Sequence, residues 1–175
     1  MQRRALLTGS MSLMAATAAL SLSGCGFALR KAPDFAFSTL YSSLPESSPL
    51  GVELRRSLQS TRKVKVISDS RQINEAQVIL DVLGDQREKV VLSRNAAGLV
   101  REFQLRTRFR FKLRTLAGKE LIPETEILQQ RDISFNESAV LAKEAEENLL
   151  YREMQSDIVQ QIMRRLAAVK SLESS

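Results

Sequence analysis

Apolar and basic side chains alternate strictly over residues 103–114, the clearest pattern in the chain. One set of alternate positions is apolar or small: Phe103, Leu105, Thr107, Phe109, Phe111 and Leu113. The other set is polar and mostly cationic: Gln104, Arg106, Arg108, Arg110, Lys112 and Arg114. A period of two residues is that of a β-strand with one buried face, so the pattern predicts a central strand with one apolar and one cationic face. Its five cations are either solvated charges that discourage misassociation or a surface for an anionic partner.

Two strands and a helix are predicted before this stretch. Residues 35–41 alternate loosely and are expected to form a strand, and residues 64–67 a second, short one. Between them, Ser48 and Pro49 are typical of a helix N-cap and a first helical position. An apolar stripe then continues the helix to about residue 60: Leu50, Leu54 and Leu58. This order predicts a right-handed crossover between parallel strands.

The middle of the chain is predicted to be an antiparallel meander. Residues 77–93 read as a long strand that bends near Gly84, and residues 94–98 as a turn in which Asn95 and Gly98 can adopt positive φ. The basic strand follows. A second turn at Ala117-Gly118 leads into a strand over residues 121–135, which Pro123 interrupts early.

The remaining chain, from about residue 138 to residue 169, is predicted to be one long amphipathic helix. Its apolar stripe is Leu150, Met154, Ile158, Ile162 and Leu166, widened by Val159 and Met163. The stripe is expected to cover the apolar face of the sheet. These elements together predict an α+β two-layer sandwich, with two helices on one face of a mixed, mainly antiparallel sheet of four to five strands.

Composition weighs against an enzyme and against a metal protein. The chain has no His and a single Cys, so the usual general base near neutral pH and the commonest metal ligand are both missing. A lipid-anchored hydrolase would need Ser–Lys chemistry, and no Ser-x-x-Lys motif lies in a suitable turn. The sequence therefore predicts no catalytic residues, no metal and no cofactor. The formal net charge of +6 suggests an acidic partner.

The first 24 residues predict an export signal that ends in a lipidation site. Arg3 and Arg4 precede an apolar stretch, and Leu22-Ser23-Gly24-Cys25 resembles a bacterial lipobox. We expect cleavage before Cys25, with a diacylglycerol and an N-acyl chain on that residue as the only added groups. Cleavage would remove Arg3 and Arg4 and lower the formal side-chain charge by two, from +6 to +4. Residues 25–34 would be a tether, 35–170 the folded domain and 171–175 a frayed tail.

Both ends of the mature chain resemble the LPS-assembly lipoprotein (LptE/RlpB) family. The start, residues 25–30, reads Cys-Gly-Phe-Ala-Leu-Arg, which is similar to that family's opening. The last helix is similar in three segments: residues 141–144, 153–154 and 161–166. The resemblance implies a non-enzymatic plug of the LptD-like translocon barrel of the outer membrane, which helps to assemble the barrel and to deliver lipopolysaccharide to the outer leaflet. Gly26 also favours the outer membrane, because an Asp there would resemble an inner-membrane retention signal.

The same resemblance implies that Arg94, at the turn, and Lys143, near the start of the last helix, contact lipopolysaccharide. Phosphates of lipid A would suit an Arg fork and a Lys point charge. The resemblance assigns nothing to the basic face, which could meet lipid phosphates or acidic groups of the barrel wall: Arg106, Arg108, Arg110, Lys112 and Arg114. An accessory lipoprotein of the outer-membrane protein insertion machinery is the alternative. Nucleic acid is not an expected partner, because an exported protein meets anionic lipid instead.

Overall fold

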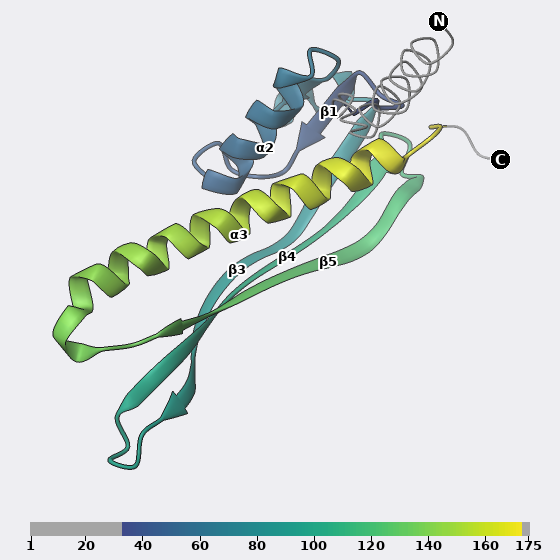
Figure 1. Cartoon of the computed structure of the whole chain (residues 1–175). Helices are drawn as coiled ribbons and strands as arrows, with labels where there is room; N and C mark the ends of the chain where they lie inside the picture. Colours follow the sequence, from purple (N-terminus) through teal and green to yellow (C-terminus); the bar gives the residue numbers. More distant parts are fainter. Residues whose placement is uncertain (1–32, 173–175) are drawn as a thin grey trace, which may run out of the picture. The chain divides into compact units, whose positions relative to one another are not determined.

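Residues 33–172 are described by the structure, a computed structural model. Their elements are β1 (Thr39–Ser42), α2 (Pro49–Ser60), β2 (Lys65–Ile67), the 3₁₀ helix η2 (Ser70–Glu75), β3 (Val78–Arg94), β4 (Val100–Thr115), β5 (Glu120–Ser134), the 3₁₀ helix η3 (Glu137–Ala139) and α3 (Val140–Ala168). The strands form one sheet in the order β2-β1-β3-β4-β5. β1 is parallel to both of its neighbours, and β3, β4 and β5 form an antiparallel meander. The helices α2 and α3 cover one face (Figure 1), so the predicted α+β sandwich is confirmed.

The apolar positions of β4 form the centre of the core. Phe109 and Phe111 are completely buried, and the leucines of α2 and the stripe of α3 close over them. A smaller cluster of Leu105, Ile133 and Met154 continues the core toward the start of α3. The buried face of β4, which repeats every two residues, therefore packs against the apolar stripe of α3, which repeats every 3.6 residues.

The first strand differs from its prediction, because it begins at Thr39 rather than at residue 35. Phe37 is buried in the core, and its ring lies 5.5 Å from that of Phe35. Ser38 donates its backbone N–H to the Gln77 side chain at 2.7 Å. Residues 35–38 therefore lead into the strand and are held by packing and side-chain hydrogen bonds rather than by strand pairing. An alternating pattern of residue types cannot distinguish such a segment from a strand.

The bend predicted near Gly84 is a β-bulge. The register between β3 and β4 shifts between Val82 and Gly84. A Cβ atom on Gly84 would lie 3.5 Å from Nε of Arg110. That distance is an ordinary van der Waals contact, so the bulge at this point does not depend on the absence of a Cβ atom.

The long helix begins two residues later than predicted and is followed by more packed chain. Ser138 lies in η3, where its backbone N–H donates to the Asn136 side chain at 3.0 Å, and α3 starts at Val140. At the other end, Leu172 packs against the core and its carbonyl accepts from Lys119 Nζ at 3.3 Å. The packed chain thus extends two residues beyond residue 170, into the segment that we expected to be frayed.

Helix α2 begins as predicted and ends with a strained residue. The Ser48 side chain accepts from the backbone N–H of Gly51 at 3.2 Å, and Pro49 is the first helical residue. After the C-cap Thr61, Arg62 has a φ of +57°, in the left-handed region. That conformation suits glycine and is costly for a residue with a Cβ atom.

Replacing Arg62 with Gly is therefore expected to stabilise the fold. We expect the free energy of unfolding to rise by about 0.5–1 kcal/mol, because relief of left-handed strain exceeds the extra entropy of an unfolded glycine. Urea unfolding measures the change. Arg62→Ala is the control, since it removes the same charge and keeps the Cβ atom. Equal stability of the Gly and Ala variants would show that the left-handed backbone is not strained.

Candidate functional site

Arg94 lies at the tip of the β3–β4 hairpin and is braced by the turn itself. Asn95 Oδ1 accepts the backbone N–H groups of Ala97 and Leu99 at 3.0 and 2.9 Å. Gly98 supplies the positive φ, +80°, that closes the turn. Arg94 Nη1 donates to the Gly98 carbonyl at 3.0 Å. One guanidinium nitrogen thus fixes the side chain over the turn, and Arg94 as a whole stays exposed.

Lys143, in the first turn of α3, is held by neighbours rather than solvated. Its Nζ donates to Ser134 Oγ and to a carboxylate oxygen of Glu146, each at 2.9 Å. Only 21% of the Lys143 side chain is exposed. An anionic ligand at this ammonium group would have to compete with the Glu146 carboxylate.

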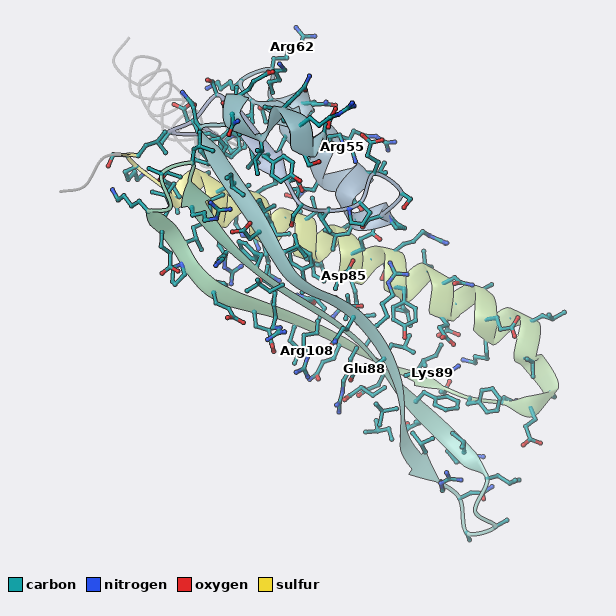
Figure 2. All side chains as sticks on the ribbon, turned by 180° about the vertical axis from the view of Figure 1, so that it is seen from behind. Arg55, Arg62, Asp85, Glu88, Lys89 and Arg108 are labelled. Atoms are coloured by element: carbon teal, nitrogen blue, oxygen red, sulfur yellow. The ribbon has the colours of Figure 1, made fainter. Side chains whose placement is uncertain are left out.

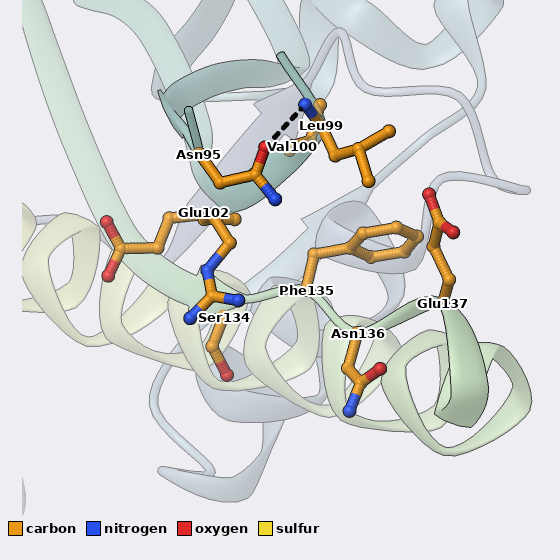
Figure 3. A pocket seen from close by; sticks show the side chains of 9 residues that line it. Asn95, Leu99, Val100, Glu102, Ser134, Phe135, Asn136 and Glu137 are labelled. Atoms are coloured by element: carbon orange, nitrogen blue, oxygen red, sulfur yellow. Dashed lines mark hydrogen bonds between the residues drawn. The ribbon is translucent and has the colours of Figure 1, made fainter. Parts of the chain in front are cut away.

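The two sequence-predicted cations lie at the same end of the sheet. Arg94 pairs with Val100 across the hairpin, and two residues farther along β4 Glu102 pairs with Ser134, the residue that Lys143 contacts. An open pocket of about 430 Å³ lies between the hairpin and the turn from β5 to α3 (Figure 3). Its lining residues are Asn95, Leu99, Val100, Arg101, Glu102, Ser134, Phe135, Asn136 and Glu137. Arg94 and Lys143 flank this pocket without lining it.

A third cation at this end, Lys89, is already neutralised. Lys89 Nζ lies 2.6 Å from a Glu147 carboxylate oxygen and 4.4 Å from the centre of the Phe103 ring. Burial raises the pKa of the neighbouring Tyr151 phenol, and the Glu147 carboxylate raises it further. Lys89 is therefore packed between β4 and α3 and does not offer a second free cation beside Lys143.

Sequence reasoning missed two features of the hairpin end. The first is Arg101, a cation that lines the pocket. The second is a set of large apolar side chains that remain substantially exposed: Val90, Val91, Leu92, Leu99 and Leu141. Leu141 is 81% exposed, and Leu92 and Leu99 are each about half exposed (48% and 50%). The run Val90-Val91-Leu92 was the available signal, because it puts apolar groups on both faces of a strand that has helices on only one.

The basic face of β4 lies on the side of the sheet away from the helices, as predicted. Carboxylates from both neighbouring strands flank it on that side. Figure 2 shows Arg108 and Glu88 on this side, and Lys89 on the side of α3. Arg114 Nε lies 2.7 Å from Asp81 of β3, Arg110 Nη1 lies 3.3 Å from Glu124 of β5, and Arg108 Nη1 lies 3.8 Å from Glu126. More carboxylates on the same face come from Glu88, Glu120 and Asp132.

The open face is therefore a charge-matched surface rather than a cationic one. The Arg106 side chain donates to Gln104 at 2.7 Å, and the Lys112 ammonium group has no hydrogen bond or ion pair within the described part of the chain. Arg108, Arg110 and Arg114 cross-link β4 to its neighbouring strands, and the carboxylates of β3 and β5 offset much of the positive charge of this face. The sequence shows Glu124 and Glu126, but only the strand register places them opposite arginines.

Cys25 lies outside the described residues, so its acylation stays a prediction. Within residues 33–172, the helices lack the length or the apolar character needed to cross a bilayer. The same residues hold no group of three His, Cys, Asp or Glu side chains suited to a metal ion.

Comparisons with known proteins agree with this fold, and the family match covers most of the described residues. A model of the family described as LptE, lipopolysaccharide-assembly, matches residues 37–166. The chain is 27% identical over 166 residues to an LPS-assembly lipoprotein of Yersinia pestis (strain Pestoides F), which covers 93% of this chain and 78% of the relative.

Two solved structures share the arrangement of strands and helices. A solution NMR structure of lipoprotein B from Nitrosomonas europaea is 34% identical with a TM-score of 0.68, and the match covers 82% of this chain and 91% of that one. A crystal structure of rare lipoprotein B from Shewanella oneidensis is 25% identical with a TM-score of 0.62, covering 75% of this chain and 95% of that one. The similarity thus spans the whole sandwich, including the hairpin and α3.

Proposed function

The chain belongs to the LptE lipopolysaccharide-assembly family, and from this premise we propose that it binds lipopolysaccharide through the hairpin end of its sheet. In this proposal acyl chains on Cys25 hold the protein at the outer membrane. Its role is binding and assembly rather than catalysis.

The observation that carries the proposal is the composition of the hairpin end. The exposed Arg94 lies two residues from Leu92 in β3 and across the turn from Leu99, and about half of each leucine is exposed. Lipid A presents phosphates next to acyl chains, so a cation bordered by apolar groups matches both parts of the ligand. Arg101, which lines the neighbouring pocket, adds a second guanidinium for the same phosphates.

Lys143 would take part by exchanging partners. A phosphate that displaced Glu146 would gain the Lys143 ammonium, while Ser134 could keep its hydrogen bond. The exchange replaces a partly exposed ion pair, which is worth little by itself, with a charge-assisted contact in a partly buried site. Lys143 is therefore expected to add selectivity for phosphate over simple apolar ligands.

The proposed partner is the LptD-like translocon barrel. The open face of the sheet is polar, charge-matched and uncovered by helices, which suits the polar interior of an outer-membrane barrel. Co-purification from native membranes distinguishes this partner from the outer-membrane protein insertion machinery. Recovery with the insertion machinery, and without a lipopolysaccharide-transport barrel, would favour the alternative.

Charge reversal at the hairpin end tests lipopolysaccharide binding. We expect Arg94→Asp with Lys143→Glu to weaken binding at least tenfold, because charge-assisted hydrogen bonds contribute about 1.5–3 kcal/mol each. Binding by the wild type should also weaken as salt screens the phosphates. The measurement is titration of the Cys25→Ser chain with lipopolysaccharide, with circular dichroism to confirm folding.

A charge-matched comparison neutralises two cations at each place: Arg94→Gln with Lys143→Gln at the hairpin end, and Arg108→Gln with Arg110→Gln on the open face. Glutamine is used there because an Asp in either position would face the Glu126 or Glu124 carboxylate and destabilise the sheet. Unchanged binding by the hairpin-end variant, together with loss of binding by the open-face variant, would place the ligand on the sheet instead.

A further inference from the structure

The outer surface of α2 carries three arginines that the fold leaves unpaired. Arg55 and Arg56 lie in the helix, and Arg62 follows its C-cap. Figure 2 labels Arg55 and Arg62 at this surface. None of the three guanidinium groups has a hydrogen bond or ion pair with any residue from 33 to 172. We call these three residues the α2 basic surface.

This lack of partners distinguishes the α2 basic surface from neighbouring cations. Lys65 pairs with Glu75 at 3.5 Å, and Arg71 pairs with Asp69 at 2.9 Å. Glu53, the only acidic residue of α2, turns toward α3, where its carboxylate accepts from Gln155 Nε2 at 2.7 Å. The helix thus uses its one carboxylate for packing and leaves its cations to solvent.

The α2 basic surface also lies where the chain enters the fold. Lys63, next to Arg62, pairs with Asp34 at 2.9 Å, which holds residue 34 beside the end of α2. Pro33 is the eighth residue after Cys25, and eight extended residue steps span at most roughly 26–29 Å. Acyl chains on Cys25 would therefore keep this end of the fold close to the headgroups. The hairpin tip lies about 50 Å away along β3, given a rise of about 3.3 Å per residue.

We propose that the α2 basic surface rests on the phosphates of anionic phospholipids in the leaflet that holds the acyl chains of Cys25. The inference rests on the proposed lipidation for its proximity argument, and it concerns a site distinct from the lipopolysaccharide-binding hairpin end. Several acyl chains already suffice for stable anchoring, so the contact adds orientation. It turns the end of the sheet that carries α2 toward the membrane surface and leaves the hairpin end free.

The expected size of the effect follows from the charge at a membrane surface. Each Lys or Arg near an anionic bilayer strengthens binding roughly fivefold, so loss of all three arginines should weaken it by roughly 100-fold at low salt. The effect should shrink near physiological salt, where the Debye length is about 8 Å. Uncharged bilayers should show no such difference.

The experiment uses residues 25–175 with Cys25→Ser, so that neither acyl chains nor the apolar export signal can mask the contact. Sedimentation is measured with vesicles of phosphatidylethanolamine and phosphatidylglycerol, and with vesicles of phosphatidylcholine alone. The test variant carries Arg55→Gln, Arg56→Gln and Arg62→Gln. Glutamine keeps the backbone demand at residue 62 unchanged, because it has the same Cβ atom as arginine. The control variant carries Arg94→Gln, Arg101→Gln and Arg152→Gln, which removes the same net charge from the hairpin end and the outer side of α3.

The proposal requires that the test variant lose binding to phosphatidylglycerol vesicles while the control variant keeps it. Equal losses would mean that net charge alone drives binding, and would overturn the proposal. A wild-type chain that fails to bind phosphatidylglycerol vesicles would overturn it as well. Lipopolysaccharide binding, measured on the same variants, distinguishes the two sites: loss of it in the test variant would make the α2 basic surface part of the lipopolysaccharide site. Failure of the proposed function would instead appear as unchanged lipopolysaccharide binding in the control variant.

Discussion

Replacing Ile158 with Asp is expected to lower the melting temperature of the protein by many degrees. Ile158 is completely buried in the main cluster between α3 and the sheet. An aspartate there either buries an unpaired carboxylate or pulls α3 away from Phe109 and Phe111, and both cost several kcal/mol. Domains of this size are stable by roughly 5–15 kcal/mol, so the variant should melt many degrees below the wild type.

Thermal melting followed by circular dichroism measures the effect, and Gln160→Asp is the matched control. Gln160 lies two residues away on the exposed side of the same helix, so it receives the same carboxylate without burying it. We expect the Gln160 variant to melt within a few degrees of the wild type. Similar melting of the Ile158 variant and the wild type would show that α3 does not pack on the sheet through this residue.

Loss of Cys25 is expected to remove the lipid anchor, so that only a protein partner can hold the chain at the membrane. Acyl chains on this residue are its proposed anchor, and the helices of residues 33–172 cannot cross a bilayer. Intact mass of the membrane-extracted protein should correspond to residues 25–175 plus lipid. Recovery of an unmodified chain that still begins at Met1 would contradict the proposed lipidation.

The Cys25→Ala variant should be exported behind a leader that is cleaved without acylation, so that an uncut signal cannot act as an anchor. We expect a high-salt wash, which also removes the electrostatic contact proposed for α2, to release the fraction of this variant that the barrel does not hold. Its melting temperature should match that of the wild type, because the cores of the described fold use no residue before Phe37 apart from the partly buried Phe35. Retention after the wash would mean that a protein partner, rather than the lipid, holds the chain.

Local pattern was enough to predict most elements and the overall layering. Ser48 and Pro49 specified the start of α2, because a capping hydroxyl and a proline without an N–H satisfy that end within three residues. Gly98 and Gly118 specified the two hairpin turns through positive φ. The period of two in residues 103–114 predicted both the strand and its buried face, since side-chain direction in a strand alternates whatever the partner.

The site was predictable only as a pair of candidate residues. Arg94 and Lys143 were expected from the family resemblance as surface cations. The fold brings them to one end of the sheet but engages Lys143 with Glu146. The exposure of Leu92 and Leu99 depends on how far along the sheet α3 extends. No local rule specifies that boundary.

By itself the sequence determined the elements, their buried faces and the position of the single cysteine, because these depend on residues a few positions apart. Only the tertiary structure decided which charges remain available. The register of β3 and β5 places carboxylates opposite the arginines of β4. The rotation of α2 sends Glu53 to α3, so that no acidic residue among those described pairs with Arg55, Arg56 or Arg62. Ion pairing depends on distances of a few ångströms between residues far apart in the chain, and folding alone sets those distances.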